Sequence, residues 1–143
     1  MFIGEYQHTL DAKGRMFVPA RFRDDLGDTF IVTLGLDNCL FVFPQEEFSR
    51  LKAKLDAVSI TNKDARRFAR FFFARASECE MDKQGRIMLP ANLRDYAGLT
   101  KDVTVVGVSN RVELWNSDAW ETDHSFDKFS PDELSEKMEL LGL

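Results

Sequence analysis

Two short segments of the chain combine an aspartate, a lysine, a glycine and an arginine at nearly the same spacing. The first is DAKGR, with Asp11, Lys13, Gly14 and Arg15, and the second is DKQGR, with Asp82, Lys83, Gly85 and Arg86. An arginine can donate two hydrogen bonds to guanine O6 and N7 in the DNA major groove, and a lysine can neutralise a phosphate. These residue types therefore indicate a DNA-binding protein rather than an enzyme.

Each segment is predicted to form a three-residue loop between two β-strands. Ala12-Lys13-Gly14 places a glycine at the last, left-handed position of such a loop. Asp11 would then face Arg15 across the hairpin and hold its guanidinium in one orientation, although facing charges attract by only about 0.2–1 kcal/mol. The alternative is that each Asp–Arg pair only stabilises its hairpin. The lysine beside each arginine favours DNA, because nothing inside the fold requires cations at exposed loop tips.

The two segments belong to a longer internal repeat. Asp82 follows Asp11 by 71 positions, and the same offset matches further glycines, prolines and arginines, namely Gly14 with Gly85, Pro19 with Pro90, Arg23 with Arg94 and Gly27 with Gly98. Glycine and proline constrain the backbone, so the two copies are expected to fold alike.

Each copy is expected to contain a hairpin, a short helical turn and a second hairpin. The segments FIVTLGLDNCLFVFP and VTVVGVSNRVELWN have the β-branched and aromatic residues of strands around a tight turn. One copy is too small to bury a full core, so the two are expected to close on each other as a small barrel without open edges.

Helices are predicted between the copies and at the C-terminal end. One begins at Pro44, and a second follows Thr61–Asp64, which resembles a capping box. A last helix begins at Ser130 and has a narrow apolar stripe of Leu134, Met138 and Leu141, which would dock on the body or on a neighbouring chain. The second helix carries a basic stripe, either a solvated face or a surface for phosphates or another subunit: Lys63, Arg66, Arg67 and Arg70.

The charge is unevenly distributed along the chain. The net charge is -5, but residues 1–100 carry 15 basic and 14 acidic side chains, whereas residues 101–143 carry 4 and 10. The overall acidity therefore does not exclude a local basic face. Without a long apolar run or a secretory signal, we expect a cytoplasmic protein that has no contact with a membrane.

The remaining residues do not suggest catalysis, a metal or a cofactor. His8 and His124 are the only histidines, and no glycine-rich phosphate-binding motif is present. Cys39 and Cys79 lack metal-ligand spacing and are expected in the core of a protein from a reducing compartment. We therefore expect no enzyme, no small-molecule substrate and no cofactor.

The segments MFIGEYQHTLDAKGRMFVPARFR, DKQGRIMLP and LGLDNCLFVFP resemble the MraZ family of bacterial transcriptional regulators. The resemblance covers residues 1–125 and implies a mainly β fold with helices (α+β), an AbrB-like swapped-hairpin barrel of two tandem halves. It implies a first half at 1–56, a linking helix at 57–72, a second half at 73–125 and an acidic C-terminal helix at 126–143.

The resemblance also implies a function. Family members form ring-shaped homo-oligomers on the nucleoid and bind direct repeats upstream of the division and cell-wall operon that includes their own gene, usually as repressors. Their DNA contacts lie in the two D-x-x-x-R motifs, which here supply Asp11, Lys13 and Arg15, then Asp82, Lys83 and Arg86. Gln84 stands where the first motif has Lys13, so the halves would contact DNA unequally. The alternatives are an AbrB-like antitoxin or adaptor that binds a protein, an enzyme on a barrel scaffold, and a purely structural ring.

Overall fold

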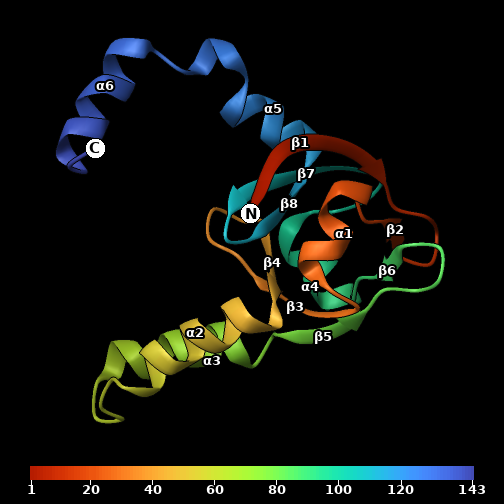
Figure 1. Cartoon of the computed structure of the whole chain (residues 1–143), viewed down its shortest axis with the longest axis horizontal. Coiled ribbons are helices and arrows are strands. Elements are labelled where there is room, and N and C mark those ends of the chain that lie inside the picture. Colours follow the sequence, from red (N-terminus) through yellow and green to blue (C-terminus); the bar gives the residue numbers. More distant parts are fainter.

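The computed structural model describes the whole chain, Met1–Leu143, as six α-helices around two antiparallel sheets (Figure 1). The first half consists of β1 (Phe2–Thr9), β2 (Arg15–Phe17), α1 (Ala20–Leu26), β3 (Thr29–Leu34), β4 (Leu40–Pro44) and α2 (Gln45–Asp56). After α3 (Lys63–Phe73), the second half consists of β5 (Ser77–Glu80), β6 (Arg86–Met88), α4 (Ala91–Ala97), β7 (Asp102–Ser109), β8 (Val112–Asn116) and α5 (Ser117–His124). A short 3-10 turn at Phe126–Lys128 leads to α6 (Pro131–Leu140). The order of elements thus repeats, as the sequence repeat predicts.

The two halves exchange strands. The large sheet has the order β1-β7-β8-β4-β3-β5, and β2 pairs with β6 in a separate ribbon. The first strand of each half therefore pairs with the third strand of the other half, β1 with β7 and β5 with β3. The α+β class and the swapped arrangement of two tandem halves are confirmed.

Two details differ from the sequence prediction. β1 and β2 leave the first loop in different directions, because β1 pairs with β7 and β2 pairs with β6 rather than with each other. The large sheet is also not closed, and β1 and β5 form its two edges. The apolar face that closure would have buried is covered by α1, α4 and the β2–β6 ribbon, whose buried side chains join those of the sheet.

A single core cluster of 21 buried residues is shared by both halves. Phe22 and Leu26 of α1 and Leu93 of α4 belong to it, together with Met16 and Ile87 from the ribbon. Neither half has such a core of its own, so burial of apolar surface, the main favourable term in folding, depends on both.

The α2–α3 pair extends from one edge of the body (Figure 1). Phe48 of α2 stacks on Phe72 of α3 with ring centroids 5.8 Å apart, which joins the two helices at the sheet. The N-terminal cap of α3 is Asn62 rather than the expected Thr61. Asn62 Oδ1 accepts a hydrogen bond from the backbone N–H of Ala65 at 3.0 Å, because an asparagine one residue later meets the first turn equally well.

The C-terminal helices differ in how they contact the body. Asn116 caps α5 through a 3.0 Å hydrogen bond from the N–H of Ala119, and Trp120 lies against Trp115 of β8. The predicted cap of α6 is confirmed, since Ser130 Oγ accepts from the N–H of Glu133 at 3.5 Å. However, α6 leads away from the sheet, and none of its residues is buried (Figure 1). None of the helices has the length and apolar character required to cross a bilayer.

Candidate nucleic-acid interface

The β2–β6 ribbon places the two predicted loops side by side. The strands are antiparallel, with Arg15 opposite Met88 and Phe17 opposite Arg86. Their central residues point into the core, and because strand side chains alternate, all four flanking residues lie on the outer face. Arg15 and Arg86, which are 71 positions apart in the sequence, therefore lie on one face of one ribbon.

The carboxylate of Asp11 organises the first loop. Its Oδ1 accepts hydrogen bonds from the backbone N–H groups of Lys13 and Arg15, both at 2.9 Å, and its Oδ2 accepts from Arg15 Nε at 2.7 Å. Gly14 follows in the left-handed region with φ of 79°, as the loop prediction requires. The loop and the Asp11–Arg15 pair are thus present as expected, although the strands on either side diverge.

The second loop has the same internal chemistry. Asp82 Oδ1 accepts from the backbone N–H groups of Gln84 and Arg86 at 2.9 and 2.8 Å, and Oδ2 accepts from Arg86 Nε at 2.9 Å. Gly85 has φ of 84°. Lys83 occupies the position equivalent to Ala12 in the first loop. The two lysines therefore project from successive rather than equivalent positions.

These contacts keep both carboxyl groups ionised. The backbone N–H of Arg15 is the main cause that lowers the pKa of Asp11, with additional contributions from the Arg15 side chain and the N–H of Lys13. The backbone N–H of Arg86 lowers the pKa of Asp82 in the same way. Because each arginine uses only its Nε in these bonds, both Nη groups of each guanidinium are free to donate to a ligand.

A second pair of arginines, which the sequence analysis matched but did not assign to the site, supports the loops. Arg94 of α4 donates from Nε to the carbonyl of Leu89 at 3.0 Å, and the N–H of Leu89 donates to the carbonyl of Gly14 at 2.9 Å. The Arg94 guanidinium lies so close to Gly14 that a Cβ added there would be 2.8 Å from its Cζ. Arg94, in the second half, therefore holds the loop of the first half.

Arg23 of α1 makes the reciprocal arrangement. It donates from Nε to the carbonyl of Val18 at 2.9 Å, and the N–H of Val18 donates to the carbonyl of Gly85 at 2.9 Å. A Cβ on Gly85 would lie 2.7 Å from Arg23 Nε. The matched positions of Arg23 and Arg94 in the repeat were the available signal, but this match does not indicate that each arginine contacts the other copy.

The two arginines that support the loops add positive charge to the site. Neither Arg23 nor Arg94 forms an ion pair with a carboxylate. Burial, with the nearby charge of Arg23, lowers the pKa of His8 on β1, so this histidine is neutral at neutral pH. The site therefore combines six basic side chains with two carboxylates that are already paired: Lys13, Arg15, Arg23, Lys83, Arg86 and Arg94, with Asp11 and Asp82.

The side chains that most often bind metal ions do not gather at a site. No group of three or more His, Cys, Asp or Glu side chains has a geometry suited to a metal ion. Cys39 and Cys79 are free and buried, as the sequence predicts. Burial raises the pKa of Cys39 to about 12 and also raises that of Cys79, so both thiols are protonated and weakly nucleophilic.

Comparison with known proteins gives a consistent family. The family model described as "MraZ protein, putative antitoxin-like" matches residues 1–71 and again residues 72–140. The chain is 55% identical to the Transcriptional regulator MraZ of Acetivibrio thermocellus over 143 residues, which is 100% of both chains. It is 56% identical to that of Carboxydothermus hydrogenoformans over 138 residues, or 96% of both chains. With the family model matching each half in turn, and both relatives matching over at least 96% of their length, the chain belongs to the MraZ family.

Proposed function

We propose that this protein is a sequence-specific DNA-binding transcriptional regulator that contacts double-stranded DNA through the β2–β6 ribbon and its two loops. Two of its similar relatives are named as transcriptional regulators. The observation that carries the proposal is the position of Arg15 and Arg86 on one exposed face of a two-stranded ribbon, each with free Nη groups. A ribbon of this kind fits the major groove.

The basic side chains would divide the contacts with DNA. Arg15 and Arg86 would donate to base edges, since guanine O6 and N7 accept a pair of hydrogen bonds from one guanidinium. Lys13 and Lys83, at the exposed loop tips, would neutralise phosphates, and Asp11, Asp82, Gly14 and Gly85 would fix the loops. Base contacts of this kind supply sequence preference, and phosphate contacts supply affinity that falls with salt.

The biological target follows from the family resemblance. The protein would repress the division and cell-wall operon that includes its own gene, by binding direct repeats in front of it as a nucleoid-associated cytoplasmic protein. It would act as a ring-shaped homo-oligomer, because several ribbons held together on repeated sites gain affinity through effective concentration. In this proposal residues 1–56 and 73–125 are the DNA-binding halves, 57–72 link them, and 126–143 form a separate acidic segment.

A second candidate is an antitoxin or adaptor that acts through a protein partner. The family description "MraZ protein, putative antitoxin-like" favours its inclusion. In that case the loop arginines would serve the fold or the partner, and binding to DNA would show no sequence preference.

The deciding experiment is a binding titration on the DNA immediately upstream of the protein's own gene. Wild type would be compared with Arg15→Ala and Arg86→Ala at several salt concentrations, on the native fragment and on a scrambled one. Arg50→Ala is the matched control, because Arg50 is an exposed arginine on α2 that pairs with Glu46 and Glu47 away from the ribbon.

We expect wild type and Arg50→Ala to prefer the native fragment, with affinity that falls steeply as salt rises. We expect Arg15→Ala to lose the preference while keeping its oligomeric state. Equal binding to both fragments by wild type, or unchanged binding by both loop variants, would overturn the proposal and favour the protein-partner alternative.

A further inference from the structure

Two large apolar side chains lie on the outer face of the β2–β6 ribbon. Phe17 is 45% exposed and Met88 is 58% exposed. Neither belongs to the core cluster or to the partly buried side chains that pack against it. The outward positions of a strand with one buried face usually carry polar side chains. The fold therefore does not account for a phenylalanine and a methionine at these two positions.

Both residues occupy the same position of the repeat. Met88 follows Phe17 by 71 residues, which is also the offset between the two loop arginines. In the ribbon, Met88 lies opposite Arg15. Phe17 lies opposite Arg86, whose guanidinium is 5.9 Å from the centroid of the phenylalanine ring. Each arginine therefore has an exposed apolar side chain directly across the ribbon from it.

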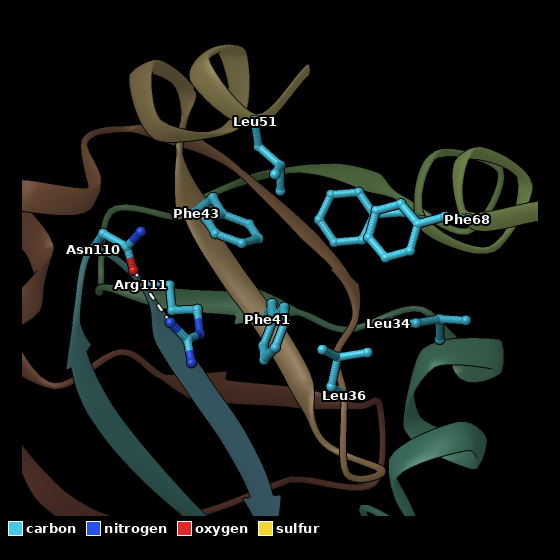
Figure 2. A pocket seen from close by; sticks show the side chains of 9 residues that line it. Leu34, Leu36, Phe41, Phe43, Leu51, Phe68, Asn110 and Arg111 are labelled. Carbon is cyan, nitrogen blue, oxygen red and sulfur yellow. Dashed lines mark hydrogen bonds between the residues drawn. The ribbon is translucent and has the colours of Figure 1, made fainter. Parts of the chain in front are cut away.

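A groove between β4 and the α2–α3 helices is a second apolar surface, with a volume of about 330 Å³ (Figure 2). Figure 2 shows Arg111 at its polar end beside Asn110, and this arginine is paired with Glu113 at 2.8 Å. The charge of the groove is thus already compensated. On the ribbon, by contrast, the Nη groups of Arg15 and Arg86 make no hydrogen bond within the chain. The ribbon is therefore the apolar surface that is better suited to an anionic partner.

The major groove of DNA offers one apolar group among its hydrogen-bonding edges, the C5-methyl group of thymine. Phenylalanine is among the side chains that contact this methyl group in protein–DNA complexes, and methionine adapts its shape to irregular apolar surfaces. Successive bases are only about 3.4 Å apart along each strand. A ribbon whose arginine donates to a guanine therefore brings the apolar side chain across from it close to the neighbouring bases.

The surroundings of Phe17 are less suited to the DNA backbone than to a base. Phe17 lines an open hollow of about 280 Å³ together with His8 of β1 and Asp102 of β7. Asp102 belongs to no ion pair within the chain, so its carboxylate would repel a phosphate at this place. The uncharged methyl group of a base meets no such repulsion. The hollow therefore favours contact of Phe17 with a base edge.

We propose that Phe17 and Met88 determine part of the sequence preference by contacting the C5-methyl groups of thymines. Each loop arginine would bind a guanine, and the apolar side chain across the ribbon from it would select a thymine beside that guanine. The contact discriminates against cytosine, which has no methyl group at this position. The inference rests on the proposed function and adds to it the bases that the ribbon would select next to the guanines.

The test removes the methyl groups from the DNA and keeps its base pairing. The fragment upstream of the gene would be synthesised either with thymine or with uracil, which is thymine without the C5-methyl group, at every thymine position. Scrambled fragments of both kinds are the DNA control. Fluorescence anisotropy would measure the binding of wild type, Phe17→Ala, Met88→Ala and the double variant. The matched control is Phe126→Ala, because Phe126 is a 93% exposed phenylalanine on the 3-10 turn, outside the ribbon.

The measured quantity is the ratio of affinities for the thymine and uracil forms of the native fragment. We expect wild type and Phe126→Ala to prefer the thymine form, by about fourfold for each methyl group that is buried. Phe17→Ala and Met88→Ala should each bind the thymine form more weakly and have a smaller ratio, and the double variant should bind both forms alike. Phe17→Leu keeps an apolar side chain but not the ring beside Arg86, so it should retain the ratio.

Each other outcome overturns the inference. An equal loss of affinity on the thymine and uracil forms would show that Phe17 and Met88 act only by holding the arginines. An equal thymine preference on the scrambled fragments would make it a general property of the DNA. If wild type prefers the native fragment but binds its two forms equally, the inference fails and the proposed function stands. If wild type does not distinguish native from scrambled DNA, both fail.

Discussion

The loops at Asp11–Arg15 and Asp82–Arg86 have the same backbone and carboxylate contacts but different surroundings. The pairing of β2 with β6 places Phe17 opposite Arg86, and the Arg86 guanidinium lies 5.9 Å from the centroid of that ring. Met88 is opposite Arg15 at the equivalent place. The side chain of Arg15 is 31% exposed and that of Arg86 is 23% exposed. The first arginine is therefore the less enclosed of the two.

The comparison separates what the repeat preserves from what it varies. The groups that shape each loop, namely the carboxylate, the glycine and the arginine of the other half, are the same in both. The groups that face outward differ, because Lys13 is matched by Gln84 and Phe17 by Met88. Two loops with the same internal contacts thus present different side chains outward, and we expect the first loop to contribute more to DNA binding.

The largest expected effect is a loss of DNA affinity that differs between the two loop arginines. Arg15→Ala should weaken binding to the preferred DNA by about 1–3 kcal/mol, the usual contribution of a guanidinium that donates two hydrogen bonds to a base. Arg86→Ala should weaken it less, because its guanidinium is already held against Phe17. Fluorescence anisotropy with both DNA fragments at one salt concentration would measure the difference. An equal or larger loss for Arg86→Ala would show that the first loop is not dominant.

The next effect concerns the contact of each loop with the other half. Gly14→Ala should destabilise the fold by about 1–2 kcal/mol through its left-handed backbone, and further because the methyl group meets Arg94. Gly98→Ala is the matched control, since Gly98 is left-handed with φ of 64° and ψ of 31°, and an added Cβ would meet only Asn116 Nδ2, at an ordinary 3.8 Å. Urea unfolding would compare them. If the two glycine variants lose equal stability, the Arg94 contact does not restrain the loop. If Gly14→Ala loses more stability than the control, adding Arg94→Ala to it should remove the difference.

A smaller effect is expected when the lysine of the first loop and the glutamine of the second are exchanged. Lys13→Gln gives the first loop the residue of the second, and Gln84→Lys does the reverse. If Lys13 contacts one phosphate, the slope of log affinity against log salt should become shallower by about 0.9 in the first variant. In Gln84→Lys this slope should become steeper by a similar amount, if the tips of both loops lie equally close to phosphates. An unchanged slope in both would place these positions away from the phosphates.

The smallest effect is a dependence of stability on pH. The native pKa values of Asp11 and Asp82 are below the ordinary value of 3.8. The stability from these groups is therefore fully present above pH 3.8 and is lost as the pH falls through the native values. Melting temperatures of wild type and of Asp11→Asn with Asp82→Asn should differ at pH 7 and converge in acid. A difference in melting temperature that stays constant down to pH 2 would show that the ionised carboxylates of Asp11 and Asp82 do not supply this stability.

The loops could be predicted from the sequence because their structure is local. The hydrogen bonds of the Asp11 carboxylate reach only Lys13 and Arg15, and the required left-handed residue is a glycine. The N-terminal caps of α3 and α6 also depend on residues close in sequence. The cap predicted for α3 differs from the observed one by only one residue. Short-range chemistry of this kind leaves a signature in the spacing of a few residues.

Strand partners could not be predicted in this way. The pattern of residues 2–9 indicates a strand, but nothing within it specifies β7 rather than β2 as the neighbour. The packing of Arg94 on Gly14 depends on that choice, because it follows from the crossing of the two halves. The same reason explains why the sheet stays open where a closed barrel was expected. Repetition in the sequence reveals two similar halves, but not how they exchange strands.

The pairing of β1 with β7 has a consequence for synthesis on the ribosome. Phe2 pairs with Ser109, and Thr9 pairs with Asp102, so the first strand finds its partner only after most of the chain has been made. Contacts between residues this far apart in sequence slow folding. Until β7 emerges, the nascent β1 exposes an unpaired edge, on which Phe2 is a residue destined for the core. Because β1 can pair only after β7 has been made, the large sheet is completed late in the synthesis of the chain.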